Sequence, residues 1–428
     1  MQKLMSLWFD SANKSRRLIL MLAFCTWIAG CATTTEDKPA PVADTVVPAT
    51  VEEVIPEPAP PPAPPKPPKP PITIAAVGDM MLGTDFPTDR LADDDGKGQL
   101  SEARIYLSRA QVAFGNLEGV LMDGGEPAKV CKDPSLCYLF RSPARYAEHF
   151  RDAGFNVLSL ANNHARDFGE EGRDASMLAL DKVGIAHSGR VGDVASWQQG
   201  DYRLAMAAFA PNIGSHSIND EDAAACLISK LAQDHDLVLV SFHGGAEGEG
   251  AMHVSDVEEF YYGESRGNVV GFSHRMIDAG ADMVIGHGPH VPRALELYRG
   301  RLIAYSLGNF ATYYGISVSG DKGVAPMLTA TLDEDGRLLE GEIISFRQRR
   351  PDGPRLDDRQ TAASLIRRLT RTDFNGGGLE FTDGGSFRPS ISPQTRPGES
   401  PRQEPAACDT DGFSPSQPVS PTDQLSHR

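Results

Sequence analysis

The chain has 428 residues, enough for one large domain or two ordinary ones, and its formal net charge is −17. An acidic chain lacks the basic surface that binds phosphate backbones, so we expect no nucleic-acid partner. Of the 32 prolines, fourteen lie between Pro39 and Pro71, and more cluster after Pro389. Such stretches do not build a packed core. The sequence therefore predicts one domain over residues 72–382 and a disordered tail over 383–428.

Residues 1–30 have the order of an export signal. Basic residues precede the apolar run 18–30, which is too short for a comfortable membrane span. The junction Ile28-Ala29-Gly30-Cys31 resembles a bacterial lipoprotein signal, cut before Cys31 and lipidated there. We therefore expect a lipoprotein anchored to a membrane of the cell envelope, facing the periplasm or the cell exterior. An ordinary signal peptide with a nearby cysteine is the alternative.

Residues 31–71 form a predicted tether. The run from Pro56 to Pro71 favours polyproline II, which extends about 3.1 Å per residue and holds a domain away from the membrane. A plain spacer is preferred here to a PxxP ligand for a recognition domain.

The cysteines agree with export. Cys131 and Cys137 lie close together, and an oxidising compartment predicts a local disulfide between them. The alternative is a structural metal pair, which no nearby CxxC or histidine pair supports. Cys226 lies in a helix-like run and is predicted to be a buried free thiol.

The middle of the chain alternates apolar runs with helical stretches. Strands are predicted at 72–79, 112–119, 155–164, 202–210, 237–245 and 281–290, with helices near 143–154, 170–183, 220–234 and 267–279. Continuous apolar runs separated by helices favour buried strands of an α/β fold. Two hairpins are predicted after them, turning at Arg299-Gly300 and at Glu334-Asp335-Gly336.

Five of the predicted strands run directly into a polar cluster. The clusters are Gly78-Asp79, Asn116-Leu117-Glu118, Asn162-Asn163-His164, His243-Gly244-Gly245 with Glu247, and His287-Gly288-Pro289-His290. One such cluster is often only a turn or a helix cap. In open α/β sheets, however, ligands bind beyond the carboxyl ends of the strands. Imidazole, carboxylate and amide oxygen suit Zn, Mn or Fe, so five clusters together predict a divalent-metal site.

A resemblance to a known family rests on five segments. They are GDMMLG, FGNLEG, LANNHARDFGEEG, SFHGGAE and GADMVIGHGPHVPRALELYRGRLIAYSLGNF, within about residues 72–350. They resemble the CapA family of bacterial capsule-synthesis or poly-γ-glutamate-synthesis proteins. The resemblance implies a calcineurin-like metallophosphoesterase fold, which is a four-layer αββα sandwich with a dinuclear metal site at the strand ends.

The resemblance also implies roles for individual residues. The implied metal ligands are Asp79, Glu118, Asn163, His243, His287 and His290. His164 matches the general acid or transition-state donor, and Asp167 either orients His164 or caps the next helix. Arg141 is a candidate for gripping an anionic group, with a surface ion pair as its alternative. Glu247 is a candidate for binding metal or substrate. Asn309 is a candidate member of the strand-end site, with a structural role in a turn as its alternative.

This sequence departs from the family pattern at three places. Met81 stands where metallophosphoesterases have a histidine ligand, and a thioether binds hard divalent ions poorly. Glu118 replaces the bridging aspartate, and the last motif is stretched to His287-x-x-His290. We therefore expect one tightly bound ion and a weaker second.

Two functional classes follow. The first is a metal-dependent hydrolase that acts on a phosphoester or on the polymer itself. The second is a membrane-anchored assembly or export factor for an extracellular anionic polymer, with membrane polymer-synthase subunits as partners. The resemblance favours polymer synthesis, whereas the chemistry of the site favours hydrolysis.

Overall fold

The computed structural model of the protein describes residues 68–129 and 138–390. The predicted signal, the lipidation site Cys31, the pair Cys131 and Cys137, and the chain beyond residue 390 lie outside the described residues. Within the two described ranges, every helix is too short or too polar to span a bilayer.

The first large sheet has ten strands in the described part of the chain. They are β1 (Ile72–Met81), β2 (Val112–Leu117), β5 (Val157–Ser159), β6 (Ala186–Ser188), β16 (Asn309–Thr312), β17 (Val324–Leu332), β18 (Leu338–Arg349), β19 (Gly353–Leu356), β20 (Leu379–Phe381) and β21 (Ser386–Pro389). Their order is β20-β21-β18-β17-β1-β2-β5-β6, with β16 beside β1 and β19 beside β18. Strands β1, β2, β5, β6 and β16 are parallel, and the later strands extend the sheet in antiparallel pairs.

The second large sheet has seven strands among the described residues. They are β7 (Ala195–Gln199), β8 (Tyr202–Ala210), β9 (His216–Ser217), β10 (Leu237–His243), β13 (Met283–His287), β14 (Leu295–Tyr298) and β15 (Arg301–Ala304). Their order is β14-β15-β13-β10-β8-β7, with β9 beside β8. The short strands β3 (Val120–Leu121) and β4 (Arg141–Ser142) pair with each other, as do β11 (Phe260–Tyr261) and β12 (Glu264–Ser265).

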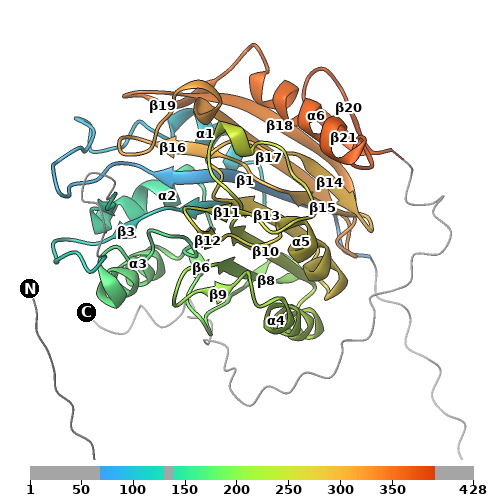
Figure 1. The fold of residues 1–428 in the computed structure, drawn as a ribbon, viewed down its shortest axis with the longest axis horizontal. Coiled ribbons are helices and arrows are strands. Elements are labelled where there is room, and N and C mark those ends of the chain that lie inside the picture. Colours follow the sequence, from blue (N-terminus) through green and yellow to red (C-terminus); the bar gives the residue numbers. More distant parts are fainter. Residues whose placement is uncertain (1–67, 130–137, 391–428) are drawn as a thin grey trace, which may run out of the picture. The chain divides into compact units, whose positions relative to one another are not determined.

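The helices flank the two sheets (Figure 1). They are α1 (Ser101–Leu107), α2 (Ala147–Ala153), α3 (Gly169–Val183), α4 (Glu221–Asp234), α5 (Val269–Asp278) and α6 (Thr361–Phe374), with 3-10 turns η2 (Ala144–Tyr146), η3 (Glu249–Ala251) and η4 (Gly320–Gly323). Helices α1, α2 and α3 share one apolar core with the outer face of the first sheet. Helices α4 and α5 share another with the outer face of the second sheet. Helix α6 joins the core between the two sheets.

Strand β1 illustrates why the sequence forms buried strands. Its side chains alternate between the two cores, because successive residues of a strand point to opposite faces. Ile72, Ile74 and Ala76 pack in the core between the sheets, whereas Ala75 and Val77 pack against α1 and α2. Both faces of β1 are therefore apolar, which produces the continuous apolar run in the sequence.

The predicted four-layer αββα sandwich is confirmed by these two stacked sheets and their flanking helices. Both predicted hairpins are present, and Arg299 and Gly300 adopt φ values of 48° and 78° in the turn between β14 and β15. Positive φ at both turn residues is the signature of a tight type I′ hairpin.

Two expectations differ from the structure. Strand β21 lies beyond residue 382, where the sequence pattern ended the domain. Its Phe387 is buried against the inter-sheet core, so the folded chain extends past that point. Cys226 is half-buried on α4 and disulfide-bonded, so the prediction of a buried free thiol was wrong. The local pattern predicted the helix correctly, but the pairing of a sulfur is a tertiary property that a local pattern does not carry.

Candidate metal centre

The polar clusters lie at the carboxyl ends of strands from both sheets. In the first sheet Asp79 of β1 pairs in register with Asn116 of β2, and in the second His243 of β10 pairs with His287 of β13. The sheets are tied together here, because His287 Nε2 lies 3.2 Å from the backbone oxygen of Val77 in β1. The strand ends of the two sheets therefore meet at one edge of the sandwich.

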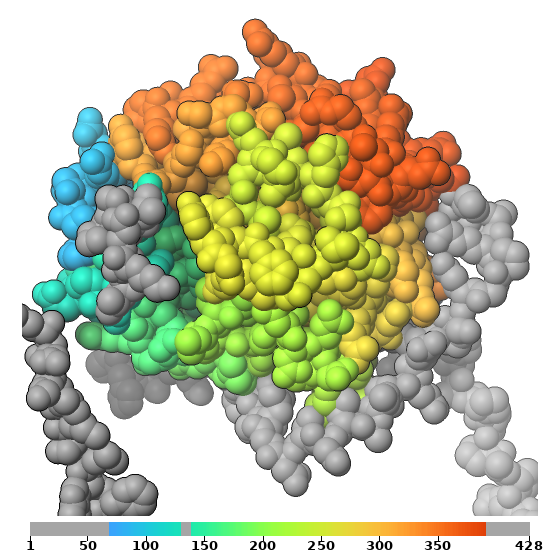
Figure 2. Space-filling model, in the orientation of Figure 1, coloured from blue at the N-terminus to red at the C-terminus, as the bar shows by residue number. Residues whose placement is uncertain are grey.

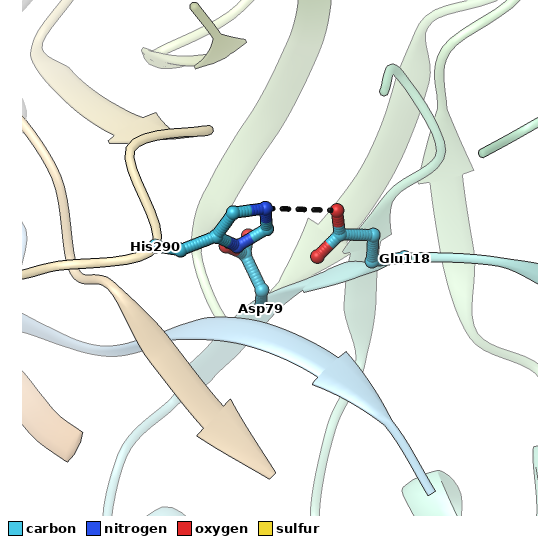
Figure 3. Close-up of side chains that lie close together, drawn as sticks. All are labelled: Asp79, Glu118 and His290. Atoms are coloured by element: carbon cyan, nitrogen blue, oxygen red, sulfur yellow. Dashed lines mark hydrogen bonds and ion pairs between the residues drawn. The ribbon is translucent and has the colours of Figure 1, made fainter. Parts of the chain in front are cut away.

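Three candidate ligands come close enough to share one ion. One ligand atom each of Asp79, Glu118 and His290 lies within 4.8 Å of the others (Figure 3). His290 Nδ1 is 3.1 Å from Asp79 Oδ2, and His290 Nε2 is 3.6 Å from Glu118 Oε1. Both carboxylates are fully buried, and the His290 side chain is 13% exposed.

The backbone at this edge is shaped for close approach. A Cβ added at Gly78 would lie 1.9 Å from the backbone oxygen of Gly308, so only glycine fits before Asp79. His290 itself has a φ of 59°, a left-handed conformation that is uncommon for a side chain of this size. Local strain of this kind is concentrated at functional sites, where the surroundings hold it in place.

Two asparagines that sequence reasoning did not assign to the site hold Asp79 in place. Asn116 Nδ2 donates to Asp79 Oδ1 at 2.8 Å, and Asn162 Nδ2 donates to Asn116 Oδ1 at 3.1 Å. Both asparagines are buried. Their signal was their position, because each stands in the same strand-end cluster as a predicted ligand.

Several buried polar atoms at this edge have no hydrogen-bond partner among the described residues. They are both carboxylate oxygens of Glu118, Oδ1 of Asn163, both ring nitrogens of His243, and Nδ1 of His287. Leaving a buried polar group unpaired costs about 1–3 kcal/mol, so such groups call for an explanation. Each of these side chains offers an oxygen or nitrogen lone pair of the kind that binds divalent ions, and His243 does so through the ring nitrogen that carries no proton. The residues present therefore fit a metal ion.

The electrostatics of the metal-free site are those of tightly coupled charges. Burial raises the pKa of Glu118 to about 8, and the neighbouring Asp79 and Glu247 also raise it. Burial opposes ionisation of Asp79 too. The hydrogen bond and the charge of His290 outweigh this effect and lower the pKa of Asp79 to about 2. Burial likewise disfavours charged His290, yet the adjacent carboxylates raise its pKa to about 10. Burial lowers the pKa of His243 and His287.

His164 forms a separate polar chain beside the three ligands. Its Nδ1 lies 2.8 Å from Asp167 Oδ2, and the other oxygen of Asp167 lies 3.0 Å from Lys129 Nζ. Asp167 also accepts a hydrogen bond from the backbone N–H of Phe140. Of the two expected roles for Asp167, the contacts match the orientation of His164, and the N-cap of α3 is Phe168. Burial lowers the pKa of His164, although Asp167 opposes this shift.

The three predicted substrate contacts lie in different settings. Glu247 Oε2 is 3.9 Å from His290 Nε2, so Glu247 lies beside the three ligands. Asn309 accepts from His290 Nδ1 at 2.9 Å and donates to the backbone oxygen of the same residue, so it holds His290. Arg141 binds Asp85 at 2.6 Å and the backbone oxygen of Gly125, which matches the ion-pair alternative.

Met81 occupies an apolar pocket rather than a ligand position. It is 1% exposed and packs with Phe140 and Ile316 in a small cluster of its own. Phe140 in turn lies against the ring of His164, with 4.3 Å between ring centroids. Apolar atoms therefore fill the place where a histidine ligand would stand.

A surface groove of about 430 Å³ lies elsewhere in the described part of the chain. It is lined by residues of β17, β18, β20 and β21, including Thr331, Glu342 and Arg388. Thr331 pairs with Thr73 at the start of β1, whereas Asp79 lies near the end of that strand. The groove is therefore separate from the strand-end site.

Comparison with known proteins places the similarity over the sandwich. Residues 73–314 match the family described as bacterial capsule synthesis protein PGA_cap. The chain is 28% identical over 278 residues to capsule biosynthesis protein CapA of Bacillus anthracis, covering 59% of this chain and 62% of that protein. It is 29% identical over 319 residues to PGA biosynthesis protein CapA of Bacillus subtilis strain 168, covering 70% and 78%. The chain thus spans about 62% of the length of the first of these relatives.

Solved structures with some likeness to this chain include a 5'-nucleotidase precursor and a purple acid phosphatase. A 5'-nucleotidase precursor from Thermus thermophilus aligns with a TM-score of 0.38 and 12% identity, covering 71% of this chain and 59% of that one. Purple acid phosphatase PPD1 from yellow lupin aligns with a TM-score of 0.31 and 8% identity, covering 65% and 51%.

Proposed function

Because the chain belongs to the bacterial capsule synthesis protein family PGA_cap, we propose that it acts in the synthesis of a capsule or poly-γ-glutamate polymer as a metal-dependent hydrolase. Its substrate would be a phosphoester or the anionic polymer itself. The observation that carries the hydrolytic part is the group of unpaired buried lone-pair atoms on Glu118, Asn163, His243 and His287. They lie at the edge where Asp79, Glu118 and His290 converge.

The residues divide into two groups by chemistry. Asp79, Glu118 and His290 would hold one divalent ion tightly, and Asn163, His243 and His287 would add ligands to it or hold a weaker second, with Zn, Mn and Fe as the candidates. When bound, such an ion supplies Lewis-acid polarisation of the scissile group. Asp167 accepts a hydrogen bond from Nδ1 of His164. This leaves Nε2 of His164 as the nitrogen that takes up or donates a proton.

A second candidate function is favoured by Met81. Its burial with Phe140 and Ile316 supports a site with one metal position missing. A protein with such a site would serve as a non-catalytic assembly or export factor that binds the polymer. Its partners would be membrane polymer-synthase subunits.

We also propose that the protein works at the cell envelope, anchored through a lipid on Cys31. The support is the order of basic residues, apolar run and Ala-Gly-Cys in residues 1–31. The proline-rich tether would let the folded domain reach a polymer at the membrane surface.

Metal analysis followed by hydrolysis assays tests the proposal. The full-length protein is analysed for Zn, Mn and Fe by mass spectrometry, and then assayed with phosphomonoesters and phosphodiesters. We expect bound metal in the wild type and its loss in His243→Ala. His149→Ala is the matched control. His149 lies on α2, outside the strand-end clusters, and its Nε2 contacts the backbone oxygen of Asp95.

Each outcome selects a function. Metal with hydrolysis that His243→Ala removes supports the hydrolase. Metal without hydrolysis favours the assembly factor. A wild-type protein that binds no divalent ion overturns the metal centre.

A further inference from the structure

Arg266 lies directly after β12 and is buried beside the candidate metal centre. Its side chain is 6% exposed, and its Cζ lies 5.5 Å from the centroid of the Tyr261 ring. Its Nη2 donates to Glu247 Oε1 at 3.2 Å, and its Nε lies 2.9 Å from Glu264 Oε2. The hairpin β11–β12, in yellow-green, lies at the surface in the middle of the face in Figures 1 and 2.

Two nitrogens of this guanidinium, Nε and Nη1, make no hydrogen bond among the described residues, and Nε has only its ion pair with Glu264. Nη1 of Arg266 is buried and makes no hydrogen bond to any described residue. A buried charged donor left unpaired is more costly than a neutral one, which costs about 1–3 kcal/mol. A guanidinium presents its donors in a planar fork that matches two oxygens of a carboxylate or phosphate. Nη1 of Arg266 is thus suited to donate a hydrogen bond to an oxyanion.

Glu247 connects this guanidinium to the metal ligands. One oxygen of Glu247 accepts from Arg266, and the other lies 3.9 Å from His290 Nε2. Arg266 is also close enough to His243 for its charge to act on that imidazole. The guanidinium of Arg266 is therefore linked to His290, one of the three converging ligands, through the single carboxylate of Glu247.

The other cations near the site are already engaged. Lys129 Nζ contacts Asp167 Oδ1 and the backbone oxygen of Asn163. Arg293 directs both terminal nitrogens at the two carboxylate oxygens of Glu259, at 2.8 and 2.7 Å. Lys129 and Arg293 are each paired with a carboxylate, whereas Nη1 of Arg266 makes no hydrogen bond among the described residues.

We propose that Arg266 binds an oxyanion group, phosphate or carboxylate, of the ligand at the strand-end site. The location of that ligand rests on the proposed function, but the binding of an oxyanion by Arg266 does not require a metal ion. Arg141, the sequence-based candidate for such a role, is paired with Asp85 instead.

Calorimetric titration of the full-length protein with inorganic phosphate, and separately with glutarate, tests this. Each titration is run without metal and with Mn²⁺. We expect Arg266→Lys to lose about tenfold in affinity for the preferred anion, because an ammonium keeps the charge but lacks the fork. Arg141→Lys is the matched control and should bind the anion as the wild type does.

A gain-of-affinity variant guards against a folding artefact. Glu264 is 44% exposed and competes for Nε of Arg266, so Glu264→Gln should tighten anion binding about two- to threefold. Bound metal should stay at the wild-type level in both Arg266→Lys and Glu264→Gln.

The two arms distinguish the two proposals. Tighter phosphate binding than glutarate binding identifies a phosphoester-type ligand, and the reverse identifies a carboxylate. Equal affinity in wild type and Arg266→Lys, with the metal retained, overturns the role of Arg266. Anion binding that depends on Arg266 in a protein without metal would leave this inference standing and overturn the metal centre alone.

Discussion

His290 Nδ1 lies 3.1 Å from Asp79 Oδ2, so the loop after β13 in one sheet is tied to the end of β1 in the other. The same nitrogen lies 2.9 Å from Asn309 Oδ1. Both contacts are to acceptors, so Nδ1 carries the proton. This leaves Nε2 of His290 facing Glu118 and Glu247. An imidazole held by one nitrogen in this way presents the other to a metal ion.

The first prediction is that metal affinity keeps rising well above neutral pH. A cation must displace the proton of Glu118, whose pKa is raised to about 8, and that of His290 Nε2, whose pKa is raised to about 10. Protons therefore compete with metal below those values. Titration with Mn²⁺ at pH 6, 7, 8 and 9, in buffers of different ionisation enthalpy, measures the affinity and the protons released. An affinity that levels off at pH 7 would contradict this prediction.

The second prediction concerns stability without metal. The pKa of Glu118 is raised from 4.5 to about 8 in the folded protein, so the folded state holds this proton more tightly than the unfolded state. The corresponding stability is present below pH 4.5 and is lost as pH rises through 8. Glu118→Gln removes this loss and should stabilise the metal-free protein at pH 9 by on the order of 5 kcal/mol, which is the shift from 4.5 to about 8 at about 1.4 kcal/mol per pKa unit.

Urea unfolding in EDTA at pH 4 and pH 9 measures that difference. The variant and the wild type should be alike at pH 4, where Glu118 is protonated in both states. The same variant should bind less metal, because it lacks a carboxylate ligand. Equal stability of the two proteins at pH 9 would show that the buried carboxylate is not strained.

The third prediction is that Cys31→Ser prevents membrane anchoring. Lipid chains contribute about 0.8 kcal/mol of membrane affinity per buried methylene, and serine cannot carry a thioether-linked lipid. Fractionation should move the variant to the soluble envelope fraction or leave it unprocessed. Cys25→Ser is the control, because Cys25 lies within the predicted signal, before the cleavage site. Normal maturation and membrane association of Cys31→Ser would exclude lipidation at this residue.

The sequence pattern was sufficient to locate the strands that are buried on both faces. Strands β1, β2, β8, β10 and β13 each start within about two residues of the predicted run, because continuous apolar character follows from packing on both sides. The turn at Arg299-Gly300 was equally predictable, since its chemistry is local. Helix α6 was missed, although its apolar residues follow a helical period, among them Ala362, Leu365, Ile366 and Leu369.

Long-range pairing was beyond the local pattern. Strand β1 lies between β2 and β17, and Ile72 pairs with Leu332 at the other end of the domain. The environment of Arg266 depends on such pairing, because its partner Glu247 comes from the loop after β10. Arg141 matched an anion-binding residue by its sequence alone, but the fold places Asp85 against it. Residue type predicted the chemistry of the site, and tertiary contacts decided which side chains are available.

The fourth prediction separates proton transfer from metal binding. His164 contacts Asp167 and packs against Phe140, and we do not count it among the ligands. His164→Ala should therefore keep its metal and lose hydrolysis by about 10²- to 10⁴-fold, the usual contribution of a general acid or base. Asp167→Asn should also keep its metal, with a smaller loss. Metal analysis and rate measurement on the same samples test this, and loss of metal from His164→Ala would make His164 a ligand.

The last prediction is that Met81 limits the site to one ion. Asp79 and Met81 are two residues apart on β1, so their side chains point to the same face of the sheet. The thioether of Met81 binds hard ions poorly. Histidine at position 81 would instead bring an imidazole to the same edge as Asp79. The metal-to-protein ratio should rise from about one toward two in Met81→His. Met81→Leu keeps the apolar contacts with Phe140 and Ile316 and should stay at one.

Stability distinguishes a formed second site from a damaged one. An imidazole without a partner in that apolar pocket should destabilise the metal-free protein by about 1–3 kcal/mol. Added Mn²⁺ should restore the lost stability in Met81→His, because an ion that binds only the folded state stabilises that state. In Met81→Leu, added Mn²⁺ should change the stability no more than it does in the wild type. Thermal melts with and without Mn²⁺, beside mass-spectrometric metal counts, measure both quantities. A ratio of two in the wild type, or a folded Met81→His that still binds one ion, would show that residue 81 does not set the number of metals.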